Sequence, residues 1–263
     1  MLSRHTVPTT MRDFDDSTLW RISAYERMRD EHGGNSGFAR LDGVPTKLPN
    51  TLLGDLAHSD GQPRDNDVVE VMAACMRHRE SALLYLQHQG YVWPVTLFTE
   101  RELYHAPRDL VESTARDLSD LTVLAFEPPG LMPPGHWKHE RIGHLEHYLP
   151  LERLFWAVAL KGPRGTLLAE IDGPVSYRAL RKSDRIELVA HGAMGSAQDR
   201  MHRDAASLRE ISGWPAMNVE RASRLLNAMY LTTQLMVVRT HASARGAQPA
   251  RRGLSQLWKT PRS

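Results

Sequence analysis

The chain has 263 residues, of which 41% are hydrophobic and 24% charged, as is typical of folded globular proteins. These values argue against a disordered chain, and no apolar run approaches the roughly 18 residues that a membrane-spanning helix needs. The net charge of +2 is too small to indicate nucleic-acid binding by itself. Cys75 is the only cysteine, which excludes an intramolecular disulfide, so we expect a reducing cytoplasmic location.

Residues 1–65 are predicted to form an N-terminal arm that is largely flexible and contains one docking helix. The arm is rich in turn-forming residues and has little hydrophobic periodicity, and its acidic start is unlike a secretory signal. The helix is predicted from about Ser17 to Glu31, where two glycines follow it. Trp20 in this helix is a candidate partner-binding residue, because aromatic anchors dominate the energetics of protein interfaces.

Residues 66–126 are predicted to form a first α+β half. Asp67 can cap a helix with an apolar side made of Val68, Val71, Met72, Cys75 and Met76. The following pattern predicts strands at 82–86, 91–98, 102–105 and 121–126, a turn at Gln89-Gly90 and a helix at 109–118. Pro94 has no amide hydrogen to donate, which predicts that its strand lies at an edge or is bulged there.

Residues 150–192 repeat a similar order and are predicted to form a second α+β half. A helix begins at Pro150 and ends at Gly162. Strands are predicted at 166–171, 174–180 and 185–190, with a hairpin turn at Asp172-Gly173. The agreement between the halves suggests an internal repeat, although helix-then-hairpin is a common order and coincidence is the alternative.

Residues 193–239 are predicted to form a helical C-terminal section. The run from Gly192 to Ala197 is predicted to be a loop before a helix whose apolar stripe extends from Met201 to Ile211. Asn218 then caps a second helix at 218–231, and a strand follows at 235–239. This order matches a winged-helix module, and equally a helical hairpin that closes a core. In the winged-helix interpretation Arg221 and Arg224 contact DNA, although acidic residues alternate with the arginines of this section.

Residues 240–263 are predicted to be a basic, disordered tail, because they are rich in Ala, Gly, Arg, Pro and Ser. Three apolar residues interrupt this solvated composition and are candidate partner-binding residues: Leu254, Leu257 and Trp258. They favour a short docking motif, while an idle chain end explains the composition equally well.

Residues 127–149, a His/Pro-rich crossover between the two halves, carry the sharpest chemical pattern. On a helix their spacing would place one set of potential metal ligands on one face: His136, His139, Glu140, His144 and His147. Imidazole and carboxylate groups bind zinc and other transition metals. The zinc-protease motif HExxH is nevertheless missed by one residue, because Gly143 occupies the place of the second histidine.

No catalytic motif is complete, so the sequence favours an α+β bacterial cytoplasmic protein that is regulatory or an adaptor, is not an enzyme and acts through protein–protein contacts. Another protein is the expected partner, and no cofactor is expected. One alternative is a metal-binding protein or metal-dependent enzyme that uses the histidines of residues 136–147, with zinc as the metal. A further alternative is a DNA-binding regulator that uses the 218–231 helix. No oligomeric state is indicated.

Overall fold

The computed structural model describes residues 19–31, 49–52, 54, 67–113, 117–180, 188 and 190–239. Its strands are β1 (Trp20–Arg21), β2 (Ala82–His88), β3 (Tyr91–Phe98), β4 (Leu103–His105), β5 (Thr122–Glu127), β6 (Tyr148–Pro150), β7 (Ser176–Ala179) and β8 (Leu235–Val238). Its α-helices are α1 (Ile22–Glu31), α3 (Val68–His78), α4 (Leu110–Ser113), α5 (Leu151–Lys161), α6 (Gly192–Arg203), α7 (Leu208–Ser212) and α8 (Val219–Leu231). Short 3-10 turns are η2 (Thr99–Arg101), η3 (His139–Arg141), η4 (Leu145–His147) and η5 (Ala169–Ile171).

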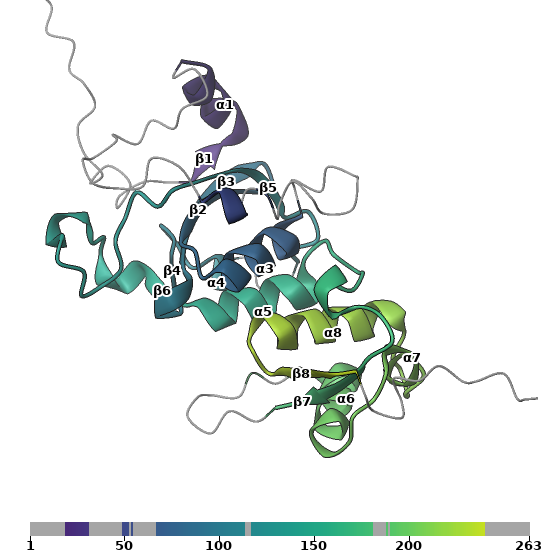
Figure 1. Cartoon of the computed structure of the whole chain (residues 1–263). Helices are drawn as coiled ribbons and strands as arrows, with labels where there is room; N and C mark the ends of the chain where they lie inside the picture. Colours follow the sequence, from purple (N-terminus) through teal and green to yellow (C-terminus); the bar gives the residue numbers. More distant parts are fainter. Residues whose placement is uncertain are drawn as a thin grey trace, which may run out of the picture.

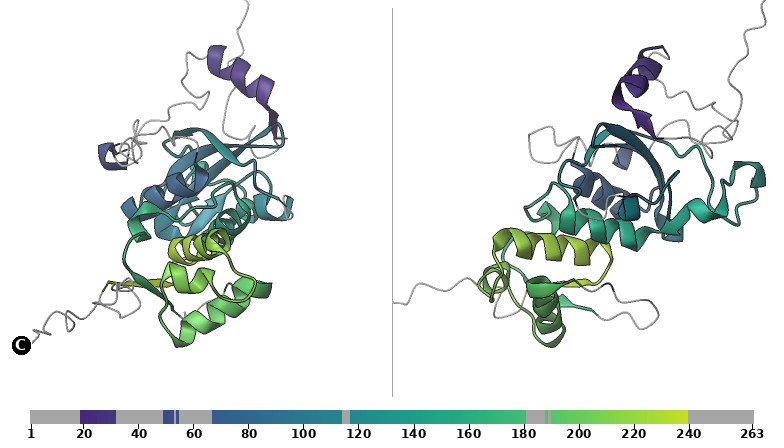
Figure 2. Two further views of the ribbon diagram at one scale, coloured as in Figure 1. Left: turned by 90° about the vertical axis from the view of Figure 1, so that its right-hand side faces the viewer. Right: turned by 180° about the vertical axis from the view of Figure 1, so that it is seen from behind.

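The elements are stacked in layers, and the α+β class predicted from the sequence is confirmed. The main sheet is antiparallel with the order β5-β2-β3-β4-β6, and β1 pairs with the start of β3. Helix α3 lies in the concave side of this curved sheet, next to α5, and α1 lies on the outer face (Figure 1). Helix α8 packs against α5 and separates it from the β7–β8 pair and α6 (Figures 1 and 2).

The first half follows most of its sequence pattern because its signals are local, but of the helix predicted at 109–118 the described residues form only α4, and residues 117 and 118 are not helical. Asp67 caps α3 by accepting hydrogen bonds from the backbone amides of Val69 and Glu70. Arg79 ends the helix in the left-handed conformation, with φ of 54°. Burial of Cys75 raises the pKa of its thiol to about 12, so this cysteine is a small apolar core residue, as its position on the helix predicts.

Strand β3 lies inside the sheet, so the prediction that Pro94 marks an edge strand or a bulge needs correction. Pro94 is paired with Tyr85 of β2 on one side. On the other side β1 pairs only with residues up to Val92, and β4 pairs only from Thr96 onward. The proline therefore occupies the gap between two neighbouring strands, where no ladder hydrogen bond is lost.

The hairpin predicted in the second half is wrong, because residues 169–171 form a 3-10 turn and β7 pairs with β8. The reason is visible in the backbone before the turn. Leu168 donates its amide to Asn227 Oδ1 over 3.0 Å, and Asn227 Nδ2 donates to the Thr166 carbonyl over 2.9 Å. Side chains of other elements thus occupy the backbone groups that a strand partner would need, and the internal repeat is not confirmed.

The C-terminal section keeps the predicted order but differs in two details. The run from Gly192 is the first turn of α6 and not a loop. The single helix predicted through Met201 and Ile211 is divided into α6 and α7, since Ser207 and Glu210 form a capping box that starts a new helix. Asn218 caps α8 as predicted, by accepting from the Arg221 amide over 2.7 Å.

The winged-helix interpretation is not confirmed. Helix α8, which would be the recognition helix, buries eight of its thirteen residues between α5 and the β7–β8 layer. Predicted features at 1–18, 32–48 and 240–263, and most of the strand predicted at 185–190, fall outside the described residues.

A buried guanidinium joins the start of α3 to the segment after α5. Arg164 has a side chain only 3% exposed and donates to Asp67 Oδ2 over 2.6 Å and to Glu70 Oε2 over 3.2 Å. Its remaining nitrogens donate to the carbonyls of Thr166 and Leu167. Burial is the main cause that raises the pKa of Glu70, and the adjacent Glu170 carboxylate adds to it.

Replacing Arg164 by Met should therefore lower the free energy of unfolding by about 3–5 kcal/mol, since two carboxylates lose the cation they share. The matched control is Arg153→Met, which removes a more exposed arginine paired with Asp109 and Glu112 and should change stability by less than about 1 kcal/mol. Urea denaturation of both variants measures the difference. Equal losses would contradict a structural role for the buried network.

Candidate interaction surface

The His/Pro-rich crossover is a closed loop and not a helix. Residues 128–147, here called the projecting loop, contain only the short turns η3 and η4. The Met132 amide donates to the Arg141 carbonyl over 2.9 Å, and Met132 and Ile142 form a β-bridge. The Tyr148 hydroxyl donates to the Met132 carbonyl over 2.6 Å and accepts from the Gly143 amide over 3.0 Å. These bonds close the loop at its base.

The projecting loop extends from the β4–β6 edge of the main sheet, away from the helices (Figures 1 and 2). It displays two large apolar side chains, Trp137 at 74% and Leu145 at 68% exposure. The Trp137 ring stacks with His136, and Lys138 Nζ lies 4.7 Å from its centroid. The sequence pattern pointed to the histidines here, and Trp137 was not predicted as a functional residue. Its exposure could have been predicted from its position next to Pro and Gly residues and outside any periodic apolar stripe.

The five predicted metal ligands are not brought to one point. His136 Nδ1 accepts a hydrogen bond from the Lys138 amide, His139 and Glu140 lie exposed in η3, and only His144 and His147 are adjacent. Across the described part of the chain, no three His, Cys, Asp or Glu side chains are grouped so that they could hold a metal ion. The helix assumed for their spacing does not form, because η3 and η4 are separate turns on either side of Gly143.

A cluster of three imidazoles forms where the loop returns to the sheet. His147 lies between His105 of β4 and His144, with ring centroids 5.7 Å and 6.1 Å away respectively. The Tyr148 ring meets the His105 ring edge-on at 4.8 Å. His105 is 4% exposed, and its Nε2 has no hydrogen-bond partner among the described residues. Burial is the main cause that lowers the pKa of His105 to about 4, and the neighbouring His147 and His144 contribute to the same shift.

The predicted partner-binding and nucleic-acid residues have internal contacts wherever the structure describes them. Trp20 stacks against Tyr25 of α1 and Tyr85 of β2, so it contributes to the small core on the outer face of the sheet. Arg224 pairs with Glu220 and donates to the Gly162 carbonyl, which closes the end of α5. Arg221 is exposed and donates to the Ala216 carbonyl. The tail candidates Leu254, Leu257 and Trp258 lie outside the described residues.

Comparisons with protein-family models, with curated proteins and with solved structures find no match to this chain. Among the described residues, no helix has the length and apolar character required to cross a membrane. The projecting loop carries the two most exposed large apolar side chains of the described residues, Trp137 and Leu145.

The buried His105 predicts a loss of stability in acid. The pKa of His105, about 4, lies below the ordinary value of 6.5. The contribution of its neutral ring to the free energy of unfolding is therefore complete above pH 6.5 and is lost as the pH falls toward 4. This difference between the two pKa values corresponds to about 3 kcal/mol of unfolding free energy. Replacing His105 by Phe should flatten the fall in unfolding free energy between pH 7 and pH 4, measured by urea denaturation. His139→Gln, at an exposed position, should keep the wild-type slope, and a steep slope in His105→Phe would contradict this origin.

Proposed function

We propose that the protein is a non-enzymatic adaptor that binds another protein through the projecting loop. The observation that carries the proposal is the Trp137 side chain, 74% exposed on a loop closed by the Tyr148 hydrogen bonds. Isolated apolar residues are common on protein surfaces, but an indole held outward on a closed loop is typical of an interface anchor.

The energetics support such a role because the loop is closed before it meets a partner. Binding by a flexible segment loses conformational entropy, and each immobilised side chain costs roughly 0.5–1.5 kcal/mol. The backbone bond from Met132 to Arg141 and the bonds of the Tyr148 hydroxyl with Met132 and Gly143 reduce that loss for the loop. A buried tryptophan anchor contributes about 2 kcal/mol or more to binding, so Trp137 can supply the hot spot of the loop.

The charges around Trp137 define the partner further. Lys138 lies over the indole ring, so an approaching surface meets a cation and an aromatic group together. A partner with an apolar pocket bordered by carboxylates would complement both. This proposal includes the regulatory role, the cytoplasmic location and the bacterial origin that the sequence favours. It also includes a second contact with the partner, made by the tail residues Leu254, Leu257 and Trp258. The metal-binding and DNA-binding alternatives stay predictions, because no contact among the described residues favours them.

Site-specific photo-crosslinking tests this proposal in living cells. A photo-reactive amino acid at Leu145 should form an adduct of one defined mass, and Trp137→Ala in the same chain should reduce its yield at least tenfold, since about 2 kcal/mol of anchor energy is removed. The protein in the adduct is then identified by mass spectrometry and its binding to the purified chain is measured.

Val219 is the matched control position, because it is a large apolar residue with 60% exposure on α8, outside the projecting loop. A photo-reactive group at Val219 should give no adduct of that mass. Identical adducts from both positions, or an adduct at Leu145 that survives Trp137→Ala, would argue against the loop as the interface.

A further inference from the structure

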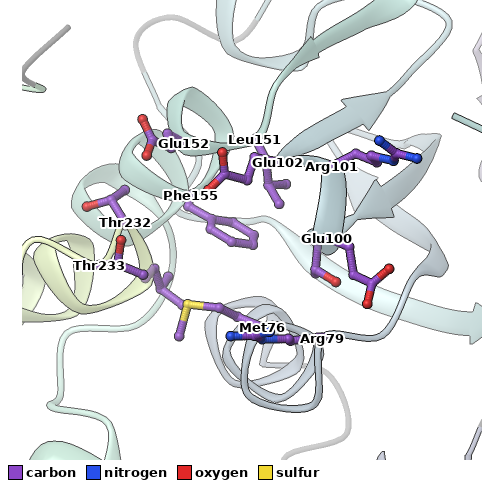
Figure 3. A pocket seen from close by; sticks show the side chains of 12 residues that line it. Met76, Arg79, Glu100, Arg101, Glu102, Leu151, Glu152, Phe155, Thr232 and Thr233 are labelled. Carbon is purple, nitrogen blue, oxygen red and sulfur yellow. The ribbon is translucent and has the colours of Figure 1, made fainter. Parts of the chain in front are cut away.

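A cavity of about 650 Å³ lies on the body of the protein, bordered by the ends of three helices and the turn η2. The C-terminal ends of α3 and α8 and the N-terminal end of α5 meet there, and Figure 3 shows Phe155 at its centre. This volume is within the range of small-molecule sites, which are about 300–1,000 Å³. The cavity shares no residue with the projecting loop.

The cavity has an apolar floor and a charged rim. Phe155, Leu151 and Leu231 are each less than 5% exposed and form the floor, with Met76 beside them. The rim carries both signs of charge together with hydroxyl groups: Arg79, Thr99, Glu100, Arg101, Glu102, Glu152, Thr232 and Thr233. An apolar body and polar groups of both signs are therefore the chemistry that this cavity complements.

Three rim residues adopt a backbone conformation that favours glycine. Arg79, Glu102 and Thr233 have φ values of 54°, 55° and 56°, and they follow the ends of α3, η2 and α8 respectively. Among the described residues only two other non-glycine positions have positive φ, Gln89 and Ala216. Most left-handed non-glycine residues of the described chain are thus gathered at one cavity.

Glycine is the residue that usually closes a helix in this conformation, because a Cβ atom is unfavourable there. The chain does use glycine at other positions of positive φ: Gly90, Gly135, Gly173 and Gly192. Side chains are retained at the cavity where glycine would be more stable. Backbone strain of this kind gathers at functional sites when the side chain itself is required.

We propose that this cavity binds a small zwitterion with an apolar side chain, namely a hydrophobic amino acid or a short peptide. The floor around Phe155 takes the apolar side chain. The Arg79 guanidinium, which lies beside Met76 on the rim (Figure 3), takes a carboxylate. The rim glutamates and the negative C-terminal ends of α3 and α8 take the ammonium group. This inference is independent of the adaptor function, which concerns a different surface.

Calorimetric titration of the purified full-length chain tests the proposal with three probes: L-leucine, L-phenylalanine and the dipeptide Leu-Phe. At least one probe should bind, and its N-acetylated amide, which lacks both charges, should bind at least tenfold more weakly. Arg79→Gly should lower the affinity at least tenfold while the urea midpoint of unfolding stays equal or rises. Glu102→Gln, which keeps the side chain length and removes its charge, should also weaken binding.

Gln89→Gly is the matched control, because Gln89 has a φ of 48° in the β2–β3 turn and lies outside the cavity. Its urea midpoint should rise and its affinity should stay at the wild-type value. The proposal is overturned if none of the three probes binds at concentrations of about 10 mM, or if Arg79→Gly binds as well as the wild type. A loss of binding in Gln89→Gly equal to that in Arg79→Gly would overturn it as well.

Discussion

The arrangement of the body depends on the burial of one charged group, the Arg164 guanidinium. It pairs with Asp67 and Glu70 at the start of α3 and donates to two carbonyls of its own segment, Thr166 and Leu167. Asn227 of α8 binds the same segment from the other side. This backbone is therefore held against α3 and α8 together, which leaves β7 to pair with β8 and places α8 between two layers.

The parts of the fold that could be predicted are those whose signals are close together in sequence. Helix α3 has its cap three residues before Glu70, and the β2–β3 hairpin has its turn between two apolar runs. The strand predicted at 166–171 fails for the opposite reason. Its conformation depends on side-chain hydrogen bonds with Asn227, about sixty residues away in the chain, and no local sequence pattern indicates these bonds.

The candidate site shows the same division between local and long-range information. The stretch from Glu127 to Pro150 is conspicuous in the sequence, and it does form the projecting loop. Its chemistry could not be predicted from spacing, because the 4, 4 and 3 spacing of the ligands brings them to one face only on a helix, and η3 and η4 are separate turns. The exposure of Trp137 depends on the loop closing through Tyr148, while Trp20, which resembles an anchor equally well, is covered by Tyr25 and Tyr85.

The pairing of β4 with β6 explains why a buried histidine, whose Nε2 has no hydrogen-bond partner among the described residues, is tolerated beneath the loop. In this register Tyr104 and Leu149 face the main core, while His105 and Tyr148 share the outer face. A slip of one residue would exchange the two faces. It would turn the Tyr148 hydroxyl away from Met132 and move Leu151 from the cavity floor. The neutral His105 ring fills the outer face at this point, so the closure of the loop and the shape of the cavity depend on the same short ladder.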